Sequence, residues 1–404
     1  MFYPINAEVG HTNQENGGDV MCISVYAIAR NEEQIAPRWY ECFKEADEVC
    51  VLVNNSTDNT AKVLNGLGAK VTVKNYDSFR FDVARNDAMK LCSPKADLLF
   101  CMDLDDTIEK GWRKEVERAW ELGRKTGKDP NSIIYSYSIW YGDNVPKQTM
   151  LRHALHTPTG WYWKSRIHEY LEGTEKKTFI YFPKLEVTSR PHRKEHSRYL
   201  PLLEEECRDP KCEARNKHLY ARELMQHRRF EDAIEWFQKH LSSIDATWPQ
   251  ERAASMKFMS DCYGNLGYEN AKELWLWKAM NEDPKDRDAP FILGRILLKK
   301  KEYRTAKEVL GRCVRIEKPE LDYPCFNLES WTERPWLCYG EAQFYAGDWK
   351  GALASIDHAL QMNPKNEIGL KMKDEIVTMV KGGMRPNMPP PEIPRERIEI
   401  PELM

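Results

Sequence analysis

The chain contains an apolar run of strand length that ends in three carboxylates, and no other segment constrains the fold as strongly. Residues 98–102 are apolar, and Asp103, Asp105 and Asp106 follow directly. Open α/β sheets bind ligands at the carboxyl ends of their strands. A turn after Asp103 would let the carboxylates converge on one hard cation, such as a divalent ion that bridges phosphates. The other interpretation is a solvated strand end, or an N-cap for a helix over residues 109–123.

Around this run, apolar segments of strand length alternate with charged or amphipathic segments of helix length. This alternation predicts a mostly parallel, Rossmann-like α/β sheet. The strands are expected at residues 22–28, 48–53, 70–74, 97–102, 132–141 and 177–182, and the helices at 32–46, 60–67, 83–91 and 109–123. The last two strands are expected to extend the sheet and close the site.

From about residue 197 the sequence becomes helical in character, and one short pattern recurs after polar turns. An aromatic residue is followed by alanine three positions later. The pairs are Phe230 with Ala233, Tyr268 with Ala271, Tyr303 with Ala306, and Trp349 with Ala352. The alanines are 38, 35 and 46 residues apart, close to the roughly 34-residue tetratricopeptide period. The pattern predicts an all-α domain of stacked helical hairpins with insertions.

Length and charge limit the classes of protein to be considered. A chain of 404 residues predicts two or three domains. Its 60 basic and 63 acidic residues leave a formal net charge of -3, which does not favour nucleic acid as a partner. The first 20 residues lack a basic start with an apolar core, and no apolar run is long enough to cross a bilayer. We therefore expect a cytoplasmic protein with no membrane span.

The 11 cysteines also favour a reducing compartment. They are scattered, without the framework of a small disulfide-rich domain. Cys207 and Cys212 lie five residues apart, and no second pair completes a zinc site.

Four short motifs occur in an order that resembles glycosyltransferase family 2. They are ARNEE at residues 29–33, STDNT at 56–60, ARN at 84–86 and DLDD at 103–106. More specifically, the chain is similar to bacterial and phage members in which a GT-A catalytic domain precedes tetratricopeptide repeats. The expected organisation is a polar segment (1–20), a GT-A domain (21–196), helical repeats (197–381) and a Pro-rich extended tail (382–404).

The resemblance implies a nucleotide-sugar site with Mn²⁺ or Mg²⁺ as cofactor. Asp103 and Asp105 would hold the metal with the donor diphosphate, and His192 would be a third ligand. Negative charge accumulates on the diphosphate as the sugar leaves, so a guanidinium such as that of Arg85 is also wanted. The alternatives without a catalytic function are a salt bridge on a helix for Arg85 and a structural role for His192.

The resemblance further implies contacts to the nucleoside and the sugar. The candidate residues are Ala29, Asn31, Glu32, Asn54, Asp58, Arg85, Asp103 and Trp161. Helix capping is the alternative for Asn31 and Glu32, and a core position is the alternative for Trp161. The family commonly has an aspartate that reads the nucleobase just before the Ser-Thr-Asp turn, whereas Asn54 and Asn55 stand here. UDP is the first candidate, but the nucleotide stays open.

On the acceptor side, an inverting displacement needs a general base for the incoming hydroxyl. By resemblance, Glu169 beside His168 is the candidate base, and Asp106 is a second catalytic carboxylate. A polar turn is the alternative for Glu169. A basic patch is formed by Arg190, Arg193, Lys194 and Arg198. It either binds the donor diphosphate or is a solvated linker.

The sequence thus predicts a metal-dependent, inverting glycosyltransferase whose repeats orient an acceptor protein, glycan or other hydroxyl-bearing molecule. Two other hypotheses remain. One is a non-catalytic repeat scaffold with a degenerate transferase domain. The other is a glycosyltransferase that acts on modified bases of phage DNA, which the net charge does not favour but a local basic groove would permit.

Overall fold

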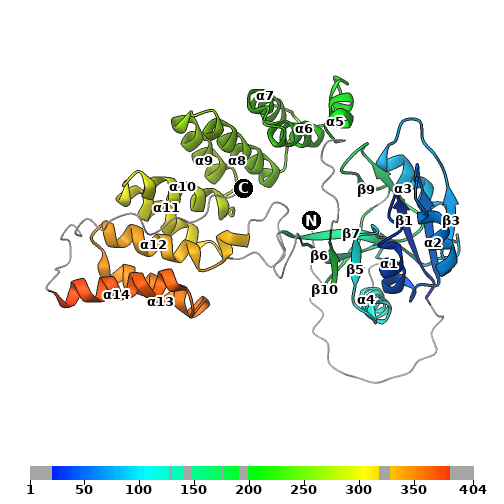
Figure 1. Cartoon of the computed structure of the whole chain (residues 1–404), viewed down its shortest axis with the longest axis horizontal. Helices are drawn as coiled ribbons and strands as arrows, with labels where there is room; N and C mark the ends of the chain where they lie inside the picture. The colour runs from blue at the N-terminus through cyan, green and yellow to red at the C-terminus, as the bar shows by residue number, and fades with distance from the viewer. Residues whose placement is uncertain are drawn as a thin grey trace. The chain divides into compact units, whose positions relative to one another are not determined.

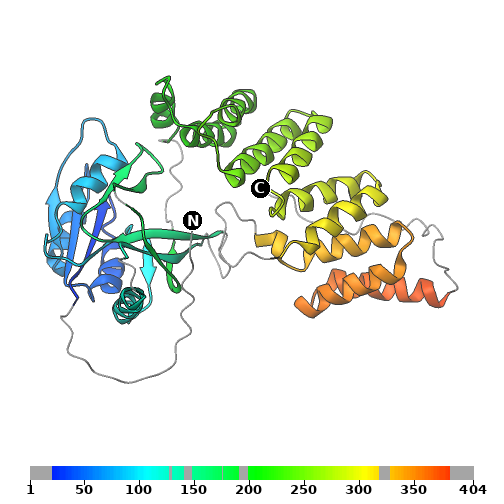
Figure 2. The same cartoon turned by 180° about the vertical axis from the view of Figure 1, so that it is seen from behind.

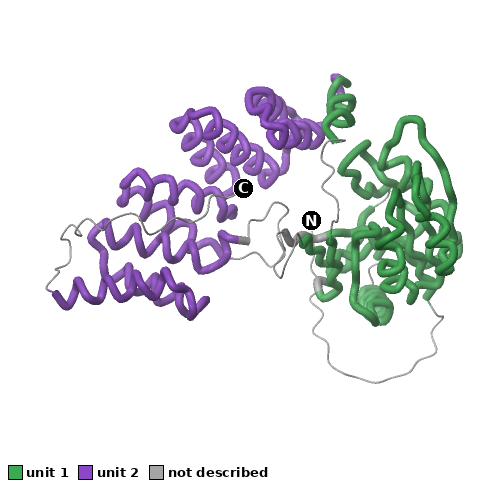
Figure 3. Tube along the Cα trace, in the orientation of Figure 1, with its two compact units in different colours: residues 1–209, 321–324 green, residues 210–320, 325–404 purple. Residues whose placement is uncertain are grey.

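The computed structural model describes residues 21–126, 130–140, 148–174, 176–190, 199–317 and 328–382. Internal contacts divide the chain into two compact units (Figure 3): residues 1–209 with 321–324, and residues 210–320 with 325–404. Unit 1 contains the sheet, and unit 2 contains helical hairpins (Figures 1 and 2). None of the described helices combines the length and apolar character needed to span a bilayer.

Unit 1 is built on an eight-stranded sheet of order β3-β2-β1-β4-β7-β6-β10-β5. Its strands are β1 (Ile23–Ala29), β2 (Glu48–Val53), β3 (Lys70–Val73), β4 (Leu98–Cys101), β5 (Asp106–Ile108), β6 (Ser132–Ile139), β7 (Gln148–His156) and β10 (Phe179–Ser189). Strands β1 to β4 are parallel, β7 is antiparallel to β4 and β6, and β10 is parallel to β6. The predicted mostly parallel α/β class is confirmed.

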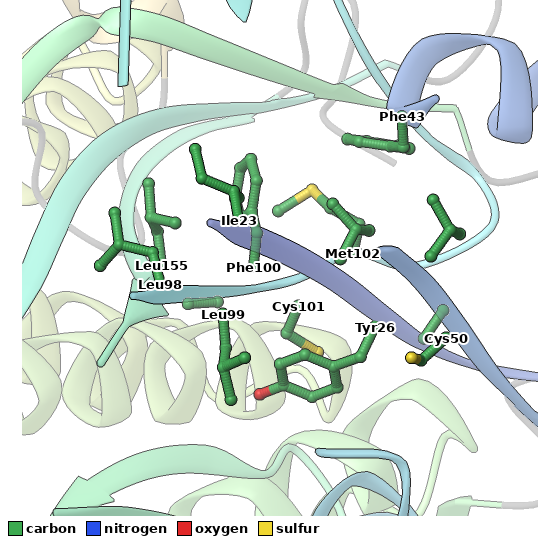
Figure 4. Packing of buried hydrophobic residues seen from close by; sticks show 14 of the residues in the cluster. Ile23, Tyr26, Phe43, Cys50, Leu98, Leu99, Phe100, Cys101, Met102 and Leu155 are labelled. Atoms are coloured by element: carbon green, nitrogen blue, oxygen red, sulfur yellow. The ribbon is translucent and has the colours of Figure 1, made fainter. Parts of the chain in front are cut away.

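Helices cover both faces of the parallel strands, and this explains why those strands are apolar on both sides. The helices of unit 1 are α1 (Ala36–Phe43), α2 (Thr60–Leu67), α3 (Phe81–Met89), α4 (Trp112–Lys125) and α5 (Tyr199–Cys207). Figure 4 shows Ile23 and Phe100 on one side of β1 and β4, with Tyr26 and Cys101 on the other. On the first side, Phe100 packs edge-on against Phe43 of α1, with ring centroids 6.3 Å apart.

Four strands of unit 1 were absent from the sequence prediction. Strand β5 has only three residues, too few to show a period. Strand β7 and the hairpin of β8 (Trp161–Lys164) with β9 (Tyr170–Gly173) mix polar and apolar residues. The predicted helix 32–46 begins later, at Ala36, because residues 33–35 form a turn and Pro37 occupies the first helical turn.

Unit 2 is a series of antiparallel helical hairpins. Its helices are α6 (Ala214–Gln226), α7 (Phe230–Leu241), α8 (Pro249–Asn265), α9 (Glu269–Glu282), α10 (Asp288–Lys299), α11 (Tyr303–Arg315), α12 (Arg334–Tyr345), α13 (Trp349–Met362) and α14 (Glu367–Lys381), with a short 3-10 helix at Leu328–Trp331. The recurring aromatic residue begins α7, α11 and α13 and caps α9. Ala233, Ala306 and Ala352 are fully buried, as the close approach of paired helices requires.

The contact between α10 and α11 gives a stability prediction. A Cβ atom at Gly294 of α10 would clash with Leu310 Cδ2 of α11. We expect Gly294→Val to force these helices apart and to cost about 1–3 kcal/mol of stability, measured as a lower thermal midpoint of the full chain by circular dichroism. Gly264→Ala in α8, which meets only the flexible side chain of Lys272, is the control. An unchanged midpoint for the valine variant would contradict close packing.

Candidate active site

The end of β4 forms a tight turn that holds the acidic cluster together. The backbone N–H of Asp106 donates to the carbonyl oxygen of Asp103 at 3.0 Å, and the N–H of Asp103 donates to Asp106 Oδ2 at 3.0 Å. The hydroxyl of Tyr137 on β6 donates to Asp106 Oδ1 at 2.8 Å. Asp106 is fully buried, so its side chain supports the turn. The catalytic role given to it from sequence stays a prediction.

Arg85 on α3 joins the acidic turn to the β8–β9 hairpin. Its Nη2 donates to Asp103 Oδ1 at 2.7 Å, its Nη1 to Cys101 Sγ at 3.1 Å, and its Nε to Glu169. The guanidinium also lies over the ring of Trp163, 5.0 Å from its centroid. The side chains of Arg85 and Glu169 are only 9% and 10% exposed. One buried cation thus contacts both the candidate metal ligand and the candidate base.

The neighbouring residue of the same motif explains why the hairpin lies where it does. Asn86 Nδ2 donates to the carbonyl oxygen of Trp163 at 2.8 Å, and the N–H of Trp163 donates to Asn86 Oδ1 at 2.9 Å. This pair of bonds fastens β8 to α3. The chain then turns through Ser165 and His168, both with positive φ, and brings Glu169 back to Arg85. Asn86 belongs to the ARN motif at residues 84–86, but no role was predicted for its side chain.

The three carboxylates at the turn differ in their proton affinity. Burial alone would raise the pKa of Asp103, but the charge of Arg85 lowers it below the ordinary value. Burial, with the charge of Asp103 added to it, raises the pKa of Asp105 to about 6 and that of Asp106 to about 8. Asp103 and Asp105 keep some exposure to solvent. Crowded, hard oxygen donors of this kind fit Mg²⁺ or Mn²⁺.

A second guanidinium, on a partly buried side chain, contributes to this environment. Arg152 on β7 lies 3.7 Å from the centroid of the Tyr137 ring, and its charge acts on all three aspartates to lower their pKa values. Arg152 was not predicted as a site residue because β7, the strand that carries it and pairs with β4, was not predicted. A lone arginine in a segment without a clear period gives no signal of its own.

The loops after β1 and β2 are tied together by the residues predicted to contact the nucleoside. Asn31, at φ 56°, accepts from the N–H of Thr57 at 2.7 Å through Oδ1. Asp58 Oδ2 accepts from the N–H of Glu33 at 3.2 Å, and Thr60 Oγ1 accepts from the N–H of Glu32 at 2.7 Å. These bonds give the two motifs a structural role at the carboxyl edge of the sheet. They leave the predicted nucleoside contacts as predictions.

Three other candidates have buried positions. Asn54 Nδ2 donates to the carbonyl oxygen of Ala29 at 3.2 Å, and both residues are at most 3% exposed. Trp161 is 5% exposed and packs beside Phe179, while its indole N–H donates to the carbonyl oxygen of Asn131 at 3.1 Å. The structure therefore brings the Trp161 ring into the core rather than to Asp103 and Arg85. On the same strand, β8, the side chain of Tyr162 is exposed to solvent (39%).

The basic segment is only partly covered by the structure. The N–H of Arg190 donates to the carbonyl oxygen of Asp105 at 3.0 Å, and its guanidinium lies 5.2 Å from the centroid of the Trp140 ring. The candidate ligand His192 and the basic residues Arg193, Lys194 and Arg198 lie outside the described residues.

Comparison with known families agrees with this geometry. The family described as "Glycosyl transferase family 2" matches residues 24–178, a span that contains Arg85, the acidic turn and Glu169. The N-terminal domain is therefore a family 2 glycosyltransferase domain. In the chain as a whole, this matched span is followed by a unit of antiparallel helical hairpins. No curated protein matches the chain.

The solved structures that are similar to this chain comprise 399 chains and include the following three. YrrB, described as a TPR protein with an unusual peptide-binding site, is 15% identical, with 45% of this chain and 84% of that chain covered and a TM-score of 0.34. The C-terminal part of a TPR repeat-containing protein from Cytophaga hutchinsonii is 12% identical, with 46% and 67% covered and a TM-score of 0.38. Pseudomonas aeruginosa pilF is 14% identical, with 45% and 77% covered and a TM-score of 0.33.

A buried hydrogen-bond chain beneath Trp163 gives a pH prediction. Trp163 Nε1 donates to the hydroxyl oxygen of Tyr26 at 2.8 Å, and that hydroxyl lies 3.0 Å from His156 Nε2. The other ring nitrogen of His156 lies 2.8 Å from the carbonyl oxygen of Thr157. Neutral imidazole satisfies this arrangement when Nδ1 carries the proton. Burial lowers the pKa of His156 to about 4.

Between pH 6.5 and 4 the unfolded state therefore binds a proton at His156 that the folded state does not. This contribution to stability is fully present above pH 6.5 and is lost as the pH falls toward 4. We expect His156→Gln to make the fall in unfolding free energy shallower by up to about 1.4 kcal/mol per pH unit. Denaturant unfolding followed by near-ultraviolet circular dichroism measures it. The exposed His358→Gln is the control, and equal slopes in all three proteins would contradict the prediction.

Proposed function

We propose that this protein is a metal-dependent glycosyltransferase that moves a sugar from a nucleotide-sugar to an acceptor hydroxyl with inversion, with a UDP-sugar as the first candidate donor. The observation that carries the proposal is the position of Arg85 between Asp103 and Glu169. An anionic leaving group needs positive charge on one side of the reacting carbon, and an incoming hydroxyl needs a base on the other.

The donor side of the proposal rests on Asp103, Asp105 and Arg85. Asp103 and Asp105 would hold Mn²⁺ or Mg²⁺ through carboxylate oxygens, and the metal would supply positive charge for the donor diphosphate. Arg85 adds a fixed guanidinium that is preorganised by burial, so little reorganisation is needed when charge develops. The loops that carry Asn31 and Asp58 form the nucleoside side, and their cross-links keep that side rigid.

The acceptor side of the proposal rests on Glu169. The hydrogen bond from Arg85 Nε orients the carboxylate of Glu169 toward the acidic turn. The two hydrogen bonds between Asn86 and the backbone of Trp163 hold the β8–β9 hairpin in place. Glu169 accepts the proton of the acceptor hydroxyl as the new glycosidic bond forms. Unit 2 orients the acceptor, since stacked hairpins offer an extended surface to a protein or glycan.

The first experiment tests the reaction itself. The full chain is incubated with a panel of nucleotide-sugars and Mn²⁺, with and without chelator, and released nucleoside diphosphate is measured by mass spectrometry. We expect slow hydrolysis of one donor, which the chelator abolishes. If no donor is turned over and none gives metal-dependent thermal stabilisation, the enzyme proposal is wrong and the scaffold hypothesis replaces it.

Two variants separate the two sides of the site. We expect Glu169→Gln to lower the rate of transfer about 10²- to 10⁴-fold, because only the base is lost, while metal-dependent donor binding is retained. Asp105→Asn is expected to abolish that donor binding, because it removes a charged metal ligand. Donor binding is measured by calorimetry and transfer by mass spectrometry. Glu121→Gln, at an exposed position of α4, is the matched control. Full transfer activity in Glu169→Gln would exclude Glu169 as the base.

A further inference from the structure

A second group of metal-ligating side chains lies at the opposite end of the parallel strands. Glu48, Cys50 and Cys92 each place a carboxylate oxygen or thiol sulfur within 4.8 Å of the other two, the one such trio among the residues that the structure describes. We propose that these three side chains form a binding site for a thiophilic divalent cation such as Zn²⁺, separate from the site at Asp103 and Asp105.

The fold brings the three ligands together without strain. Glu48 and Cys50 are two residues apart on β2, so their side chains point to the same face of the sheet. Cys92 lies in the turn after α3, where its N–H donates to the carbonyl oxygen of Met89 at 3.2 Å. The next residue, Ser93, donates its N–H to Glu48 Oε2 at 2.7 Å. This bond anchors the turn against the start of β2 and sets the sulfur of Cys92 beside that of Cys50.

The donor set selects the class of cation. Two sulfur ligands with one carboxylate suit Zn²⁺ and similar borderline ions, whereas Mg²⁺ and Mn²⁺ prefer oxygen ligands. Cys50 is fully buried and Cys92 is 8% exposed, so the sulfurs are shielded from competing water. The side chain of Glu48 is 23% exposed and provides the path from solvent. The thiols bind as thiolates, so each cation bound displaces two protons to solvent.

A positive charge already occupies the entrance to this trio. Lys70 Nζ on β3 donates to Glu48 Oε1 at 3.3 Å and to the carbonyl oxygen of Leu91 at 2.7 Å. Its side chain is 56% exposed, so it can turn outward and release Oε1. The other oxygen, Oε2, keeps its bonds from Ser93 and from the hydroxyl of Ser24 at 3.1 Å. A bound cation would replace the ammonium of Lys70 without disturbing the anchor.

The site is independent of the proposed transferase chemistry. Glu48 begins β2, whereas the donor loops follow its last residue, Val53, roughly 16 Å further along an extended strand. A cation at Glu48, Cys50 and Cys92 links β2 to the turn after α3, the helix that carries Arg85. Its role is therefore to fix the position of α3, and the chemistry of sugar transfer does not require it.

The test uses the full chain, kept reduced, titrated with Co²⁺ as a spectroscopic probe and with Zn²⁺ as competitor. We expect one equivalent of Co²⁺ to give the near-ultraviolet charge-transfer absorption of cobalt–thiolate bonds, and Zn²⁺ to remove it. Cys92→Ser is expected to abolish the absorption, while Cys42→Ser, a cysteine of α1 outside the trio, retains it. No thiolate absorption in the unaltered chain, or its persistence in Cys92→Ser, would overturn the proposal.

Two further variants keep the test decisive if a cysteine variant fails to fold. Glu48→Gln keeps an oxygen that accepts from Ser93 but loses the charge, and we expect it to weaken Zn²⁺ binding at least about tenfold. Lys70→Met removes the competing ammonium from an exposed position, and we expect about fivefold tighter binding. Weaker or unchanged binding in Lys70→Met would contradict the proposed exchange of cations. Mn²⁺-dependent donor turnover, measured in parallel, reports the other site separately.

Discussion

The buried guanidinium of Arg85 is the interaction on which the arrangement of the N-terminal domain depends. It contacts Asp103 from β4, Glu169 from the β8–β9 hairpin and the ring of Trp163. Removing one partner of a buried ion pair leaves a charge that neither water nor protein neutralises, which typically costs about 3–5 kcal/mol. The site is thus organised around a charge balance, two carboxylates against one cation. Burial raises the pKa values of Asp105 and Asp106, and the charge of Asp103 adds to this effect, whereas at Asp103 the charge of Arg85 outweighs burial and lowers the pKa.

Much of this domain could be predicted from the sequence because its signals are local. The runs that became β1, β2 and β4 are apolar on both faces, as strands of a covered parallel sheet must be. The helix at Thr60–Leu67 was bounded correctly because a polar turn precedes it and Gly68, with positive φ, ends it. The match of residues 24–178 to family 2 confirms the resemblance that four short motifs implied.

What the sequence could not supply is non-local. The charge of Arg152 acts on the three aspartates because β7 lies between β4 and β6 in the sheet. No local sequence pattern predicts this strand pairing. Trp161 and Trp163 are the same residue type and are similarly buried. Trp161 packs against Phe179, whereas the ring of Trp163 lies under the guanidinium of Arg85. Asn86 forms hydrogen bonds with the backbone of Trp163, 77 positions later in the chain. In each case the partner, and not the residue itself, decides the role.

The chain of hydrogen bonds from Trp163 through Tyr26 to His156 links three strands by a single hydroxyl group that both accepts and donates. A phenylalanine at position 26 would leave an indole N–H and an imidazole nitrogen buried together without a partner, and each such group costs about 1–3 kcal/mol. These three positions are consequently not free to change one at a time. In homologous proteins, residues 26, 156 and 163 should therefore be substituted together. Such covariation would show that the hydrogen-bond chain beneath the site is retained in those proteins.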